Sequence, residues 1–163
     1  MLRISLLELV ARGIPEGFLF VMAIYAFARR KIEIKPYLIS VLAVVTFTFL
    51  FRYLDINFGV HIILNIIVLI VCCVFVCKID LYVVVKGSMI TTLLMLAVEM
   101  INVLILRIVL GDDFLKIVEN PVQKVIAGLP GIVLFAIVII NGYYFLSLRK
   151  KAEATEKSSG EAG

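Results

Sequence analysis

The stretch that decides the fold is residues 125–148, VIAGLPGIVLFAIVIINGYYFLSL, which contains no charged residue. A helix of roughly 20 apolar residues crosses a hydrocarbon core about 30 Å thick, so this stretch is long enough to span a membrane. Four apolar stretches of the same kind precede it, at residues 6–28, 37–53, 58–77 and 87–110. Because lipid offers the backbone no hydrogen-bond partner, each stretch is expected to be a helix.

The composition excludes an ordinary water-soluble globule, since 63% of the residues are hydrophobic, 17% are charged and the mean hydropathy is +1.15. We therefore expect an all-α integral membrane protein, a bundle of about five transmembrane helices, with four to six compatible with the pattern. Residues 1–150 form this helical domain. Residues 78–86 are expected to form a short amphipathic connector at the membrane interface. Residues 151–163 are small and polar, which predicts a disordered cytoplasmic tail.

The basic residues predict how the chain is oriented. If the loop after the first stretch is cytoplasmic, ten Lys and Arg residues lie inside and six lie outside. The excess of positive charge on the inner side predicts an external N-terminus and a cytoplasmic C-terminus in a multi-pass protein of the bacterial cytoplasmic membrane. The net charge of +4 is then a feature of membrane topology, so the expected partner is the lipid bilayer and not nucleic acid.

Ionisable and amide side chains inside the apolar stretches predict a binding site, because each is costly in lipid and needs a partner or a function. Glu99 lies near the middle of residues 87–110 and is expected to pair with Arg12 or Arg52. In the predicted orientation the polar residues gather in the outer half of the membrane, around a water-accessible vestibule. The predicted ligand-binding residues are Arg12, Glu16, Arg52, His61, Asn65, Glu99 and Asn102.

Two of these residues have a simpler interpretation that stays open. Glu8 precedes Arg12 by four residues, the favourable spacing for an ion pair on one helix, so the two side chains can neutralise each other at the membrane surface. A single histidine near the start of a helix, such as His61, is commonly just a hydrogen-bonded residue of the interface. These alternatives assign both residues a structural role.

Two Gly-x-Pro segments, Gly13-Ile14-Pro15 and Gly128-Leu129-Pro130, lie at similar distances from the outer ends of the first and last stretches. Proline removes a backbone hydrogen bond and bends a helix. Gly13, Pro15, Gly128 and Pro130 are therefore predicted to transmit a signal through helix bending. Kinks that are fixed for packing are the alternative. Gly13 and Gly17 form the one mid-span G-x-x-x-G motif.

Catalytic groups are sparse, so the chain is expected not to be an enzyme and to hold no metal or cofactor. His61 and Cys72 lie roughly 16 Å apart along a helix, too far for direct proton exchange. Cys72, Cys73 and Cys77 are adjacent or four residues apart on one apolar stretch. This spacing is poor for disulfides, and the cysteines are expected to be small apolar residues of the bundle.

Several short motifs resemble the membrane sensor region of AgrC-like, GHKL-type histidine kinases of Gram-positive bacteria. These are the proline-containing first helix with Glu8 and Glu16, Arg52 followed by Gly59-Val60-His61, and Asn120-Pro121 before Gly128-Leu129-Pro130. The likeness covers residues 5–150. Where such a kinase continues into a dimerising helix and a phosphoacceptor histidine, this chain has a short polar segment, so kinase activity is not expected of it.

The resemblance implies a non-catalytic sensor module that binds an extracellular or membrane-borne signal, in the manner of quorum sensing, and acts on a partner protein. That partner is expected to be a membrane histidine kinase of a two-component system or another membrane protein, and a homo-oligomer is also open. The alternative is a small-solute binding or transport subunit. A membrane peptidase of the AgrB kind is disfavoured by the separation of His61 from the cysteines.

Overall fold

The computed structural model describes residues 9–52, 58–111 and 121–160, and all the regular structure in them is helical. A π-helical turn, η1 (Leu9–Gly13), leads directly into α2 (Ile14–Phe27). The further helices are α3 (Ile34–Arg52), α4 (Phe58–Phe75), α5 (Leu81–Leu110) and α7 (Pro121–Gly160). The prediction of an all-α protein is confirmed.

Four helices in the described part of the chain are long and apolar enough to cross a membrane. They comprise Val10–Phe27, Ile34–Phe51, Leu81–Leu110 and Val125–Phe145, and α4 adds the shorter apolar run Ile62–Phe75. The chain thus has the architecture of a multi-pass membrane protein. The predicted orientation and the fifth crossing remain predictions.

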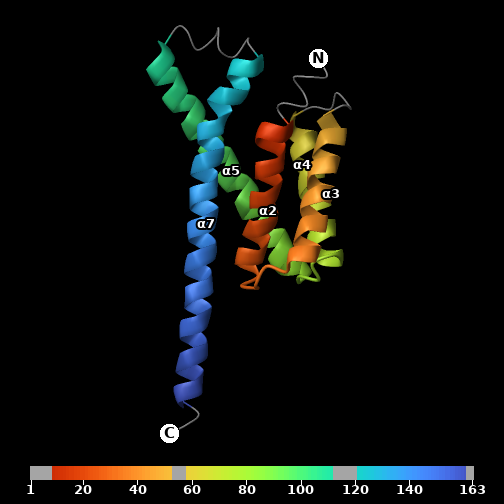
Figure 1. The fold of residues 1–163 in the computed structure, drawn as a ribbon, viewed down its shortest axis with the longest axis vertical. Helices are drawn as coiled ribbons and strands as arrows, with labels where there is room; N and C mark the ends of the chain where they lie inside the picture. The colour runs from red at the N-terminus through yellow and green to blue at the C-terminus, as the bar shows by residue number, and fades with distance from the viewer. Residues whose placement is uncertain (1–8, 53–57, 112–120, 161–163) are drawn as a thin grey trace.

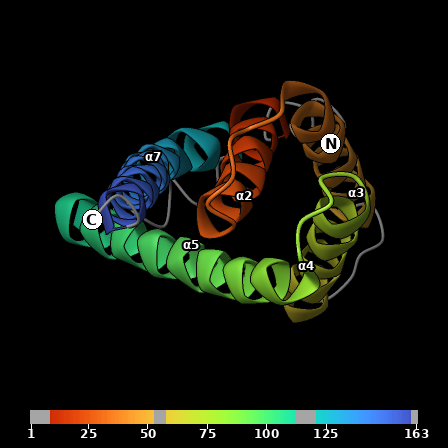
Figure 2. The same ribbon diagram turned by 90° about the horizontal axis from the view of Figure 1, so that it is seen from below.

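Helix α2 is the central element of the bundle and contacts α3, α4, α5 and α7 (Figures 1 and 2). Helix α3 packs beside α4, and α5 reaches from α4 on one side of the bundle to α7 on the other, as Figure 2 shows. The first short element, η1, contacts both α3 and α7. A side chain of η1 can therefore meet the last helix of the chain.

Two packed cores lie on opposite faces of α2. Val21, Ile24 and Tyr25 face a core shared with α3, α4 and the start of α5. Leu19 and Ala23 face a second core built with Met95, Val98, Ile132, Phe135 and Ile139 of α5 and α7. Because α2 belongs to both cores, it couples the α3–α4 side of the molecule to the α5–α7 side.

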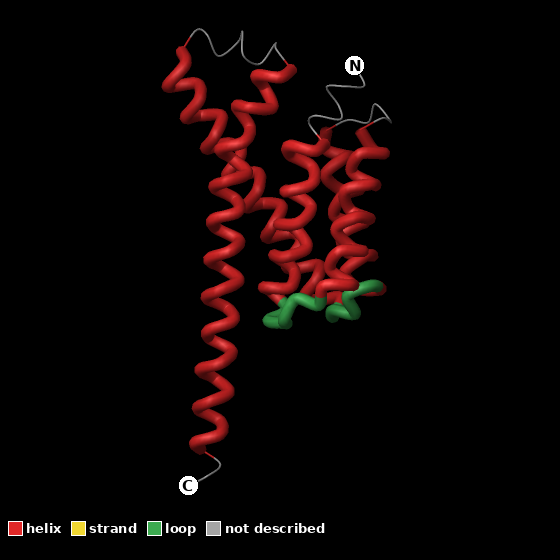
Figure 3. Tube along the Cα trace, in the orientation of Figure 1, coloured by secondary structure: helices red, strands yellow, loops and turns green. Residues whose placement is uncertain are grey.

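Two short connections close one end of the bundle, drawn as green loops in Figure 3. After α2, Arg29 takes a left-handed conformation (φ 50°), and the amide of Arg30 donates to the Tyr25 carbonyl at 3.2 Å. This Schellman motif caps the helix. The Arg30 side chain donates to the Lys78 carbonyl at 3.0 Å. The first connection is thereby tied to the second one, residues 76–80.

The predicted connector at residues 78–86 is too long, because residues 81–86 belong to α5, and its place at the membrane interface stays a prediction. Asp80 caps α5 by accepting a hydrogen bond from the Tyr82 amide at 2.9 Å, so the helix begins at Leu81 and runs without a break to Leu110. An N-cap carboxylate satisfies an amide that has no partner within the helix. Val84 is fully buried in the first core, which draws this segment into the bundle.

Helix α7 continues beyond the other helices, as Figures 1 and 3 show. Composition predicts disorder from residue 151, whereas the helix continues to Gly160. The membrane-crossing part of α7 has already met the cost of helix nucleation, and extension adds only propagation steps. Alanine, glutamate and lysine, which dominate residues 151–157, are good helix formers.

Candidate functional site

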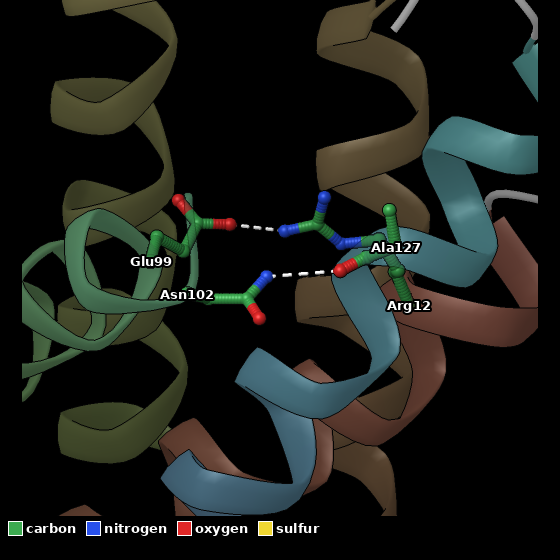
Figure 4. Close-up of polar contacts among 4 residues, drawn as sticks. All are labelled: Arg12, Glu99, Asn102 and Ala127. Carbon is green, nitrogen blue, oxygen red and sulfur yellow. Dashed lines mark hydrogen bonds and ion pairs between the residues drawn. The ribbon is translucent and has the colours of Figure 1, made fainter. Parts of the chain in front are cut away.

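The centre of the site is an ion pair between Arg12 of η1 and Glu99 of α5, in which Arg12 Nη2 donates to Glu99 Oε1 (Figure 4). The two residues are far apart in sequence and come from the first and fourth predicted stretches. The structure thus pairs Glu99 with one of the two arginines that the sequence offered. A carboxylate within an apolar helix is neutralised by this contact.

The π-helical turn explains how Arg12 reaches this position. Pro15 has no amide hydrogen, and in a regular helix its ring would clash with the carbonyl four residues earlier, that of Ala11. The chain widens into η1, Leu9–Gly13, immediately before the proline and resumes α-helix at Ile14. Such π turns redirect side chains, and they occur frequently at functional sites.

The pair is only partly shielded. The Arg12 side chain is 17% exposed and that of Glu99 is 34% exposed. Within the part of the chain that the structure describes, the buried Nε of Arg12 has no hydrogen-bond partner. The guanidinium therefore keeps a donor without a partner among the described residues, next to a carboxylate that is about one-third exposed. The arrangement can hold, open or exchange an ion pair; a nucleophile is not part of it.

Asn102, one turn after Glu99 on α5, joins the site to α7. Its Nδ2 donates to the Ala127 carbonyl at 2.9 Å, and the residue is 7% exposed (Figure 4). The bond falls within the turn before Pro130, where a helix bends because the proline cannot donate. The carbonyl that loses its helical donor to Pro130 is that of Ile126, next to Ala127, so the Asn102 amide joins α5 to α7 at the start of this turn.

Two glycines of α7 make room for these polar side chains. A Cβ atom on Gly128 would lie 3.0 Å from Arg12 Nη1, and one on Gly131 would lie 3.4 Å from Asn102 Cβ. The site is thus formed where η1, α5 and α7 meet around the side chains of Arg12 and Asn102. Gly128, which the sequence predicted as a bending point, lies directly at the ion pair, and Pro130 follows it by two residues.

The other predicted residues lie elsewhere or outside the description. Asn65 of α4 accepts a hydrogen bond from the Thr48 hydroxyl of α3 at 3.0 Å, in a contact between different helices. Glu16 is half-buried on α2. The side chains of Arg52 and His61 fall outside the described residues. Of the seven predicted ligand-binding residues, the structure brings together Arg12, Glu99 and Asn102.

The predicted G-x-x-x-G motif serves packing within the chain. Gly13 and Gly17 are both buried, and a Cβ on Gly17 would lie 2.6 Å from Val45 Cγ2 of α3. The absence of a side chain lets α2 and α3 approach closely. This contact accounts for Gly17, the second glycine of the motif.

Sequence reasoning missed Thr48, Ala127 and Gly131. Thr48 is a threonine in an apolar stretch, which gives no signal of a partner. Ala127 contributes only its carbonyl, and a backbone acceptor leaves no trace in residue type. Gly131 did carry a signal, because it directly follows the Gly128-Leu129-Pro130 segment.

No protein-family profile matches the sequence, and no curated protein or solved structure shows significant similarity to it. The site must therefore be interpreted from its own chemistry. Among the described residues, no three His, Cys, Asp or Glu side chains are grouped so that they could hold a metal ion.

Proposed function

We propose that this chain is a non-catalytic sensor module of the bacterial cytoplasmic membrane, in which a signal at the Arg12–Glu99 pair alters the course of α7. The observation that carries the proposal is that the ion pair lies against Gly128, two residues before Pro130. Opening or closing of this ion pair therefore changes the packing of α7 next to Pro130, where the helix is easiest to bend.

The path away from the site supports the proposal. Helix α7 contacts η1, α2 and α5 and then extends past the rest of the bundle to Gly160 (Figure 1). Because α7 packs against the bundle at one end and projects from it at the other, a change in the tilt of α7 would move its projecting end relative to a partner protein. In the orientation that the charges favour, this far end is cytoplasmic, and the resemblance to AgrC-like sensor regions points to a histidine kinase as the partner.

The transmission step is tested by a distance measurement along α7. Spin labels are attached at Tyr82→Cys on α5 and Tyr144→Cys on α7, both of which are exposed, in a variant without the three native cysteines. Glu99→Gln breaks the charge pair and is expected to shift the distance distribution measured by pulsed electron paramagnetic resonance. Thr92→Val, two turns earlier on α5, is the matched control and should leave it unchanged. If the labelled protein and its Glu99→Gln and Thr92→Val variants gave the same distance distribution, the proposed transmission from the ion pair to α7 would be wrong.

The partner is tested separately, by crosslinking in native membranes followed by co-purification and mass spectrometry. Recovery of a histidine kinase supports the proposed function. Recovery of an ATPase component of a transporter, or of a small molecule retained by the purified protein, would instead assign the partly exposed ion pair to solute binding. Arg12→Ala is expected to abolish the response of the recovered partner while membrane insertion is kept.

A further inference from the structure

A second cluster of reactive groups lies around Cys77, in the connection between α4 and α5 and away from the ion pair. Cys77 Sγ lies 3.2 Å from Ser40 Oγ and 3.8 Å from the Pro36 carbonyl, both on α3. Tyr25 and Cys73, which are 2% and 0% exposed, belong to the same packed core as Cys77. The proposed function makes no use of this cluster.

The local backbone sets Cys77 apart from the helix that precedes it. Helix α4 ends at Phe75, and Lys78 takes a left-handed conformation (φ 51°) that reverses the chain. The amides of Cys77 and Ile79 still donate to the carbonyls of Cys72 and Cys73, at 3.4 and 3.2 Å. Cys77 is therefore held over the end of α4 and turned towards α3. The spacing argument against a disulfide assumed a continuous helix through Cys77, and this conformation removes that assumption.

The Cys77 sulfur lies within hydrogen-bond distance of the Ser40 hydroxyl, and either atom can be the donor. The Cys73 thiol and the Tyr25 hydroxyl also favour its ionised form. These hydrogen bonds, that of Cys73 first, lower the pKa of Cys77 below the ordinary value of a thiol. Donors stabilise the thiolate, which is the nucleophilic form of cysteine. Cys72 is also buried, but among the described residues it is not a member of this core.

We propose that Cys77 is a site of reversible oxidation by peroxides, with Cys73 as the resolving thiol. In the first step the Cys77 thiolate attacks one peroxide oxygen, the S–O bond forms, the O–O bond breaks, and the departing oxygen takes up a proton as water or alcohol. In the second step the Cys73 sulfur attacks the resulting sulfenic acid, the S–O bond breaks, and water leaves as the proton of Cys73 is transferred. Two thiols lose two electrons and one peroxide gains them.

The geometry permits the disulfide and gives it a consequence. The amide of Val76 donates to the Cys72 carbonyl at 2.9 Å, so the chain keeps a helical course up to the end of α4. Cys77 then leaves this course, because its amide donates to the carbonyl of Cys72, five residues earlier, and its sulfur interacts with the Cys73 thiol. A Cys77 sulfur bonded to Cys73 gives up its contacts with Ser40 and Pro36. Oxidation would thereby release residues 76–80 from the first turns of α3.

The experiment exposes the full chain in detergent to hydrogen peroxide, blocks the remaining thiols with N-ethylmaleimide and maps the peptides by mass spectrometry. The expected product is a Cys73–Cys77 peptide that has lost two hydrogen atoms and regains them with dithiothreitol. Cys73→Ser should stop the reaction at a Cys77 sulfenic acid, which dimedone traps. Ser40→Ala should slow the first step several-fold, because it removes one donor to the thiolate.

Cys72→Ser is the matched control and is expected to leave the rate and the product unchanged. The proposal is overturned if Cys72 is oxidised as fast as Cys77, if Cys72→Ser prevents the crosslink, or if Cys77 stays reduced at peroxide concentrations that oxidise free glutathione. The thermal unfolding of each variant, measured in the same detergent, shows whether its fold is kept. The test is independent of the sensor role, since it requires neither a partner nor the ion pair.

Discussion

Gly17 shows how a single missing side chain sets the distance between two helices. A Cβ at this position would meet Val45 Cγ2 at 2.6 Å, closer than van der Waals contact allows. Gly17→Ala is expected to destabilise the bundle by about 1–3 kcal/mol, because α2 and α3 must move apart. Gly142→Ala on α7 is the matched control, since a Cβ there meets nothing within 4 Å, and it should be neutral or slightly stabilising. Thermal unfolding in detergent compares the two variants, and equal stability of both would contradict the close approach.

Thr92 illustrates a polar atom that the fold leaves without a partner. Its Oγ1 is buried and makes no hydrogen bond within the described residues. Thr92→Val keeps the shape and removes the unsatisfied hydroxyl, so a stabilisation of about 0.5–2 kcal/mol is expected. A titration with sodium dodecyl sulfate from mixed micelles measures it. A loss of stability would indicate that a water molecule satisfies the hydroxyl.

At the scale of elements, the ion pair couples η1 to α5. Arg12→Met alone or Glu99→Met alone leaves one charge unpaired in the membrane and should destabilise the protein by about 1–3 kcal/mol. The double variant removes both charges and is expected to recover most of that loss. The same titration measures the four proteins of this double-mutant cycle. Additive losses would show that the two side chains do not depend on each other.

Much of the element structure could be predicted from the sequence, because apolar length alone decides which segments become membrane helices. The boundaries that failed depend on single contacts. Asp80 caps α5 and so turns residues 81–86 into its first turns, which hydropathy cannot detect. The continuation of α7 past residue 151 depends on the helix that precedes it, whereas composition alone describes an isolated segment.

The candidate site was predictable in its charges and less so in its geometry. Arg12, Glu99 and Asn102 stand out because charged and amide groups are rare in apolar stretches. Their meeting point depends on the π-helical turn before Pro15 and on the space beside Gly128, and both are properties of the folded backbone. Placing all seven polar residues at one depth did not reveal that Asn65 contacts Thr48 between α3 and α4.

At the scale of the whole molecule, the orientation in the membrane determines which end receives the signal. The connections after α2 and α4 lie at the same end of the bundle (Figure 3), and the basic residues predict that this end is cytoplasmic. Lys31→Cys and Tyr82→Cys, in a variant without native cysteines, should react with a membrane-impermeant maleimide only after the cells are permeabilised. Labelling of both positions in intact cells would show that this end is external, so the orientation and the direction of signalling would be the reverse of those proposed.

The length of α7 turns a small change of angle into a large displacement. From Pro130 to Gly160 the helix measures roughly 45 Å at its standard rise, so a tilt of about 10° at the proline would carry the far end sideways by roughly 8 Å. That is close to the width of a helix. A change at the ion pair, amplified along this lever arm, would move the far end of α7 far enough to bind or release a neighbouring protein.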